Sequence, residues 1–195
     1  MPPLNTTLGL STIGLAVLVS AVFYRHRGRA YALDKSQVIR SLPGSAAVAR
    51  VVTIASAVVG ALSFVVPQPY LLILHSNAWL VYLGCAFALA SLSIFIWAKV
   101  TLGQHYSPCF DSFVPHSLVC RGPYARVRHP IYTANIALLC SFFMACGSLL
   151  FIPIIVVLAI YYVHSAIAEE ARLSEALPGY AEYMTTTGRF IPRCF

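Results

Sequence analysis

The chain alternates between long apolar runs and shorter polar segments. Five apolar runs occupy residues 7–24, 47–66, 77–97, 131–146 and 149–168. A membrane-spanning helix needs about 20 mostly apolar residues, and only the run at 131–146 is short for a full span. The pattern therefore predicts an all-α, polytopic membrane protein with about five transmembrane helices.

Only Gly147 and Ser148 separate the last two runs. So short a connection requires two neighbouring antiparallel helices, which predicts a helical hairpin. We expect three N-terminal transmembrane helices within residues 1–99. Residues 100–195 then hold a loop that re-enters the membrane, the hairpin and an amphipathic C-terminal tail, all within a single structural domain.

The charges predict which side of the membrane each segment faces. With an outside N-terminus, three segments are cytosolic: 25–46, 98–130 and 169–195. These segments hold every Lys and Arg except Arg50, whose side chain can extend to the same face. The loops at 67–76 and 147–148 hold none. The net charge of +7 thus reflects topology, with a cytosolic C-terminus, and no nucleic-acid partner is expected.

Cations and aromatic rings concentrate in RGPYARVRHPIY, from Arg121 to Tyr132, directly before the fourth run. Gly-Pro favours a turn, and Pro130 suits the first turn of the following helix. Arg and Tyr also anchor helix ends at membrane interfaces. In addition, the unpaired N–H groups of a helix N-terminus can bind an anionic group. The side chains expected there are those of Tyr124, Arg128, His129 and Tyr132.

An acidic pair, Glu169 and Glu170, lies where the last apolar run ends. A solvated acidic face explains most isolated pairs of this kind. At the point where an apolar helix leaves the membrane, however, ionisable residues favour a functional role. Helical spacing after the pair predicts an apolar stripe formed by Leu173, Leu177 and Tyr180.

Together the two stretches resemble the isoprenylcysteine carboxyl methyltransferases and related integral-membrane methyltransferases. The shared pattern is GPYxxVRHPxY, a helical hairpin, EExxL, GYxxY and FxP, spread here over residues 102–192. The N-terminal half matches only in hydropathy. The small chain resembles the compact prokaryotic or archaeal members, which implies a prokaryotic cell membrane rather than the endoplasmic reticulum.

The resemblance implies S-adenosylmethionine as the cofactor, bound by residues 100–195 at the cytosolic interface. The cofactor-binding residues it implies are His116, Ser117, Leu118, Val119, Tyr124, His129, Pro130, Ile131, Tyr132, Glu169 and Glu170. Their chemistry is compatible with this ligand, because tyrosine rings suit adenine or a sulfonium cation and carboxylates suit ribose hydroxyls or an ammonium group. The sequence has no GxGxxG motif, so the soluble methyltransferase fold is not expected.

The resemblance also implies in-line methyl transfer to the carboxylate of a lipid-modified, isoprenylcysteine-like acceptor that enters from the bilayer. A carboxylate is ionised near neutral pH, so the site has to align and desolvate it. Arg128 and Arg172 are the candidates for holding it, and Glu169 completes the predicted catalytic set. Eukaryotic relatives carry an arginine where this chain has Ser165.

Three alternatives stay open. Phospholipid methyltransferases share much of the motif and methylate an amine, which must first lose a proton. Sterol reductases share similar RHP and EE elements and use NADPH. A membrane scaffold or small-molecule carrier would bind neither cofactor.

A zinc site is also conceivable from a repeated H-x3-C spacing, although no CxxC or HxxxH pattern supports it, and we expect no metal. The residues concerned are His105, Cys109, His116 and Cys120.

Overall fold

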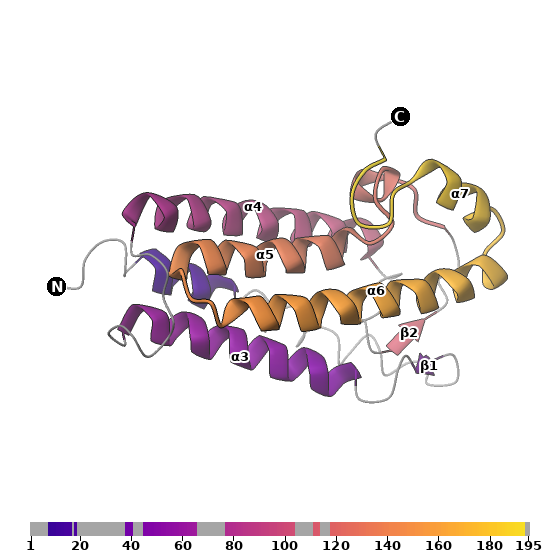
Figure 1. Ribbon diagram of the computed structural model, residues 1–195. Helices are drawn as coiled ribbons and strands as arrows, with labels where there is room; N and C mark the ends of the chain where they lie inside the picture. Colours follow the sequence, from indigo (N-terminus) through magenta and orange to yellow (C-terminus); the bar gives the residue numbers. More distant parts are fainter. Residues whose placement is uncertain are drawn as a thin grey trace.

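In the computed structural model, the described part of the chain is helical apart from one small sheet (Figure 1). The structure describes residues 8–16, 18, 38–40, 45–65, 77–103, 111–113 and 118–193. The longer helices are α3 (Ser45–Val65), α4 (Ala78–Leu102), α5 (Pro130–Cys146) and α6 (Phe151–Ala176). The shorter elements are the 3-10 turn η4 (Gly122–Ala125), helix α7 (Tyr180–Thr186) and the strands β1 (Val38–Arg40) and β2 (Asp111–Phe113).

The described helices follow the predicted apolar runs. The last four runs correspond to α3, α4, α5 and α6. In the first run, residues 8–16 and 18 are helical, and the rest of that run lies outside the described residues. Helices α4 and α6 continue past their predicted ends, because the Lys, Glu, Arg, Leu and Ala residues that follow are good helix formers even where they are not apolar.

Among the described residues, two helices, α4 and α6, are long and apolar enough to cross a membrane. Helix α5 and the segment Val51–Ser63 of α3 are apolar but shorter. Many large apolar side chains point outward from the two long helices, among them Leu83, Phe87, Val156 and Ile160. Helices that are apolar on their outer faces as well as their inner ones are typical of membrane spans. Five spans and an outside N-terminus stay predictions.

Helices α5 and α6 form the predicted antiparallel hairpin and lie side by side in Figure 1. Gly147 ends α5 in the left-handed conformation, with φ 68°, and its N–H donates to the Phe143 carbonyl at 2.8 Å. Glycine adopts this conformation without the steric cost that a Cβ atom brings. The tight turn therefore follows directly from the local sequence.

Close packing against α4 fixes the end of α5 and the turn before its start. A Cβ atom on Gly84 would lie 2.7 Å from the backbone nitrogen of Ala145, so only glycine fits between the two helices. At the other end of α4, a Cβ atom on Gly122 would lie 2.9 Å from Oγ1 of Thr101. The turn η4 is thus held against the end of α4, immediately before α5 begins.

The sheet was not predicted. Strands β1 and β2 pair antiparallel, with Val38 opposite Phe113 and Arg40 opposite Asp111. They come from two segments that the charge pattern assigns to the same side of the membrane, and their pairing is consistent with that assignment.

Candidate functional site

The site lies where three segments meet: the start of α5, the polar end of α6 and the C-terminal tail. His129 precedes α5 with φ −121° and ψ 58°, outside the helical region, and Pro130 begins the helix. A residue before proline avoids the helical conformation, because the proline ring would clash with its backbone N–H and Cβ. The local sequence therefore turns the chain so that His129 and Tyr132 project toward the end of α6.

The tail runs beside the residues that precede α5. Val127 and Gly188 form an isolated parallel bridge. The N–H of Arg128 donates to the Gly188 carbonyl at 2.8 Å, and the N–H of His129 donates to the Arg189 carbonyl at 3.0 Å. Because these bonds satisfy backbone groups on both segments, they fix the register that brings Arg189 into the site.

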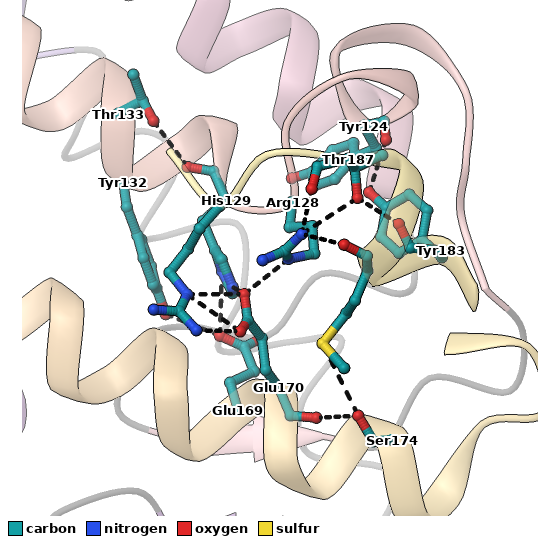
Figure 2. Close-up of polar contacts among 12 residues, drawn as sticks. Tyr124, Arg128, His129, Tyr132, Thr133, Glu169, Glu170, Ser174, Tyr183 and Thr187 are labelled. Atoms are coloured by element: carbon teal, nitrogen blue, oxygen red, sulfur yellow. Dashed lines mark hydrogen bonds and ion pairs between the residues drawn. The ribbon is translucent and has the colours of Figure 1, made fainter. Parts of the chain in front are cut away.

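Glu170 is the centre of a cluster of three cationic or ionisable side chains. Arg128 Nε donates to its Oε1 at 2.8 Å, His129 Nε2 lies 3.2 Å from the same oxygen, and Arg189 Nη2 donates to Oε2 at 2.7 Å (Figure 2). The side chains of Arg128 and Glu170 are only 8% and 6% exposed. Paired charges with several hydrogen bonds can remain buried, whereas an unpaired one would be costly.

Arg128 also supports the tail directly. Its Nη1 atom donates to the Met184 carbonyl at 3.0 Å and to the carbonyl of Thr187. With these bonds and its ion pair to Glu170, the guanidinium joins three segments of the protein. Arg189 was not predicted as a site residue, yet its Nε donates to Oε1 and its Nη2 to Oε2 of Glu170, and these contacts raise the pKa of Arg189.

Glu169 has different surroundings from its neighbour. The hydroxyl of Tyr132 donates to its Oε2 at 3.0 Å, and His129 Nδ1 lies 3.7 Å from the same oxygen. The side chain is 28% exposed, and within the described residues its other oxygen accepts no hydrogen bond. Glu169 thus keeps acceptor capacity for a ligand, whereas both oxygens of Glu170 are engaged.

Tyr132 stacks on two other rings. Its centroid lies 5.1 Å from that of His129 and 4.4 Å from that of Tyr162, with interplanar angles of 11° and 6°. Tyr162 on α6 is fixed in turn by a hydrogen bond from Asn135 Nδ2 at 2.7 Å. The stack holds the Tyr132 hydroxyl at Glu169. Because the two neighbouring rings cover the ring of Tyr132, a ligand can contact its hydroxyl and ring edge rather than a ring face.

Helix α7 covers the turn η4. The buried hydroxyl of Tyr183 donates to the Tyr124 carbonyl at 2.6 Å, and Thr187 Oγ1 donates to the Tyr183 carbonyl at 2.6 Å. Burial raises the pKa values of Tyr183 and Tyr180 above the ordinary tyrosine value, so both stay neutral near pH 7. The predicted apolar stripe is confirmed as part of a cluster formed by Leu118, Leu173, Leu177, Tyr180, Tyr183 and Met184.

The structure brings together five of the predicted site residues: Arg128, His129, Tyr132, Glu169 and Glu170. Tyr124, Pro130 and Ile131 are buried beside them, and Leu118 and Val119 are half-buried against the two apolar clusters. Arg172 is half-buried and makes no hydrogen bond or ion pair with any described residue. His116 and Ser117 lie outside the described residues.

The residues present fit a ligand such as S-adenosylmethionine. They offer a carboxylate with an unused oxygen, a tyrosine hydroxyl and an imidazole, which match hydroxyl, ammonium and carboxylate groups.

Three of the four residues considered for zinc, His105, Cys109 and His116, lie outside the described residues. Within residues 118–193 and the other described ranges, no three His, Cys, Asp or Glu side chains are grouped to hold a metal ion.

Comparison with known proteins places this site within a family. The model of the phospholipid methyltransferase family matches residues 79–178, just over half of the chain, which include α4, α5 and the Glu169–Glu170 pair. A search of curated proteins finds no significant match. The predicted resemblance is thereby confirmed for the wider group of integral-membrane methyltransferases. Members of this group typically use S-adenosylmethionine. Membership of the isoprenylcysteine subfamily stays a prediction. The chain belongs to the phospholipid methyltransferase family, a family of membrane methyltransferases.

Proposed function

We propose that the protein transfers a methyl group from S-adenosylmethionine to the polar head group of a lipid-tailed acceptor, and that the head group is an amine. The observation that carries the choice of an amine is the distribution of charge at the site. Arg128, His129 and Arg189 all converge on Glu170, so the two guanidinium groups are engaged with that carboxylate rather than directed at an acceptor. Glu169 keeps a carboxylate oxygen for a ligand, and a carboxylate attracts a cation.

Bound at this site, S-adenosylmethionine supplies an electrophilic methyl group on a positively charged sulfur. The residues of the chain have to bind this cofactor, align the acceptor with the methyl group and exclude water. We assign cofactor binding to Tyr132, His129 and the Glu169 oxygen that these two residues face, with Tyr124 and residues 116–119 as further contacts, and we assign the other Glu169 oxygen to the acceptor amine. The stack of Tyr132 on His129 and Tyr162 supports this assignment, because it fixes the Tyr132 hydroxyl before any ligand arrives.

An amine reacts only after it has lost its proton. Two groups stand where they can take that proton. One oxygen of Glu169 accepts no hydrogen bond from any described residue, and His129 Nδ1 lies 3.7 Å from the other oxygen of Glu169. A carboxylate can also bind the ammonium form first and hold the amine in place while it is deprotonated.

A carboxylate acceptor of the isoprenylcysteine kind is the second candidate. One observation favours it: Arg172 is a half-buried cation one helical turn after Glu169, with no partner among the described residues. A guanidinium in that position suits a two-oxygen contact with a carboxylate. Arg128 is less suited to the same role, because its donors already serve Glu170 and the tail.

The test is a labelling experiment with both acceptor classes. The purified full chain is incubated with methyl-labelled S-adenosylmethionine and, separately, with phosphatidylethanolamine and a farnesylcysteine analogue in mixed micelles. We expect label on the phosphatidylethanolamine nitrogen that withstands mild base. Base-labile label on the farnesylcysteine analogue alone would replace the amine with the carboxylate, and label on neither would refute the proposal.

An Arg172→Gln variant separates the two acceptors further. For an amine acceptor its transfer rate should stay within about twofold of wild type, because the amine needs no cation. For a carboxylate acceptor the loss of a charged hydrogen bond should raise KM by about tenfold or more.

A further inference from the structure

Ser165 on α6 carries a buried hydroxyl that has no partner among the described residues. The residue is 7% exposed, and its Oγ atom makes no hydrogen bond within the part of the chain that the structure describes. A buried hydroxyl normally finds a partner, because leaving one unpaired costs free energy. An unpaired hydroxyl next to a functional site therefore needs an explanation.

Serines and threonines elsewhere in these helices show what Ser165 does not do. Each of the following donates its hydroxyl to the carbonyl four residues earlier: Thr12, Ser56, Ser63, Ser91, Ser93, Thr101, Ser141 and Ser174. A serine in a helix can make this bond without any movement of the backbone. Ser165 lies in the middle of α6, and its hydroxyl makes no such bond to any described residue of its own helix.

Ser165 shares the inner face of α6 with the residues of the site. It follows Tyr162 by three positions and precedes Glu169 by four, and residues at these spacings lie above one another on a helix. The rise of about 1.5 Å per residue places it about 6 Å from Glu169 along the axis. A single bound molecule can span that distance.

Ser165 lies on the apolar side of Glu169. Toward the start of α6, the helix presents Val156, Val157, Ile160 and Val163 on its outer surface. The polar contacts with the tail and with the turn before α5 all lie at the opposite end of the helix. A polar cofactor fits that end. The exposed apolar residues lie on other faces of α6 than the buried Ser165, so the head group of a lipid has to enter between α6 and its neighbours, and from the apolar side it meets Ser165 before Glu169.

We propose that the Ser165 hydroxyl binds the amine head group of the lipid-tailed acceptor, accepting a hydrogen bond from its N–H. This inference rests on the proposed function and adds a residue for acceptor recognition. A hydrogen bond from the N–H orients the nitrogen, so that after deprotonation its lone pair can face the methyl group. The buried hydroxyl then gains in the complex the partner that it lacks in the free protein.

The experiment compares Ser165→Ala with Ser141→Ala in the purified full chain. Ser141 is a matched control, because it is fully buried and its hydroxyl bonds to the Ala137 carbonyl of its own helix. Three quantities are measured for each variant: the melting temperature without ligands, the Kd for S-adenosylhomocysteine, and the KM for phosphatidylethanolamine in mixed micelles.

Removing an unsatisfied buried hydroxyl should leave the melting temperature of Ser165→Ala equal to that of wild type or higher. Its Kd for S-adenosylhomocysteine should stay within twofold, while its KM for phosphatidylethanolamine rises about tenfold. Ser141→Ala should change neither ligand parameter.

Three results would each overturn the inference. A lower melting temperature for Ser165→Ala would mean that the hydroxyl already has a structural partner. Weaker binding of S-adenosylhomocysteine would assign the hydroxyl to the cofactor, and an unchanged KM for phosphatidylethanolamine would remove its role in acceptor binding. If wild type methylates phosphatidylethanolamine and Ser165→Ala does so equally well, only this inference fails. If wild type methylates no lipid amine, the proposed function fails as well.

Discussion

At the scale of single residues, two adjacent glutamates have opposite surroundings. Glu170 is buried and holds Arg128, His129 and Arg189, whereas Glu169 is partly exposed and receives a hydrogen bond from Tyr132. Neighbours on a helix point about 100° apart, so α6 directs one carboxylate to the tail and the other to the ring stack. We infer that Glu170 maintains the fold and Glu169 binds the ligand.

Replacing each glutamate by glutamine tests this division. Glu170→Gln leaves Arg128 buried without a compensating charge, so the free energy of unfolding should fall by about 3 kcal/mol. Glu169→Gln should change stability little but weaken binding of S-adenosylhomocysteine by about tenfold to a hundredfold. Denaturant unfolding in detergent and calorimetric titration measure the two effects. Equal destabilisation by both variants would contradict the assignment.

The sequence predicted most of the residues that meet at this site but not their partners. The motif residues are recognisable because a cationic, aromatic stretch and an acidic pair flank apolar runs. Arg189 and Tyr162 gave no such signal. Arg189 reaches Glu170 only because the tail pairs with the residues before α5, and Tyr162 reaches Tyr132 only because α5 packs on α6. Both contacts depend on tertiary structure rather than on local pattern.

At the scale of elements, the tail depends on Gly188. A Cβ atom at this position would lie 1.7 Å from the Ile191 carbonyl oxygen, so even alanine requires the backbone to move. Gly188→Ala should therefore break the bridge to Val127 and release Arg189 from Glu170. We expect weaker binding of S-adenosylhomocysteine and faster proteolysis of the tail. Arg193→Ala serves as control, because Arg193 is exposed and bonds only within the tail region.

A chain truncated after Gly188 should show the same loss of binding, because Phe190 packs against the His129 ring and its carbonyl accepts a hydrogen bond from Thr133. Unchanged affinity for S-adenosylhomocysteine in the truncated protein would show that the tail has no part in the site.

Two helical glycines, Gly84 on α4 and Gly60 on α3, offer a matched pair of substitutions. A Cβ atom on Gly84 would meet backbone atoms of Ser141 and Ala145 at 2.8 and 2.7 Å, whereas one on Gly60 would meet only the side chains of Ile13 and Phe151. Flexible side chains can move aside and a helix backbone cannot. Gly84→Ala should lower the free energy of unfolding by about 1 to 3 kcal/mol, and Gly60→Ala should change it less. A larger loss of unfolding free energy in Gly60→Ala than in Gly84→Ala would contradict this packing.

The helices themselves were predictable because apolar runs of this length have few alternatives in a membrane. The hairpin followed from a two-residue connection ending in a left-handed glycine. Helix α7 and the small sheet were not predicted as such, because both are short and are stabilised by contacts with distant segments. Close approaches such as that at Gly84 leave no signal in a single sequence.

At the scale of the whole molecule, the account requires the site to face the cytosol. Cys120 is exposed beside the Arg121–Tyr132 stretch, whereas Cys85 and Cys146 are buried. In a variant that keeps Cys120 as its single cysteine, a membrane-impermeant maleimide should label inside-out vesicles and spare right-side-out vesicles. The opposite pattern would reverse the predicted orientation. A control with no cysteine gives the background.

The most direct test of the central claim is a calorimetric titration of the purified protein with S-adenosylhomocysteine. We expect saturable binding with about one site per chain, weakened in Glu169→Gln and His129→Ala while both variants keep their helical circular dichroism. No binding to folded wild-type protein, or full affinity in both variants, would contradict the claim that the end of α6 and the start of α5 form the cofactor site.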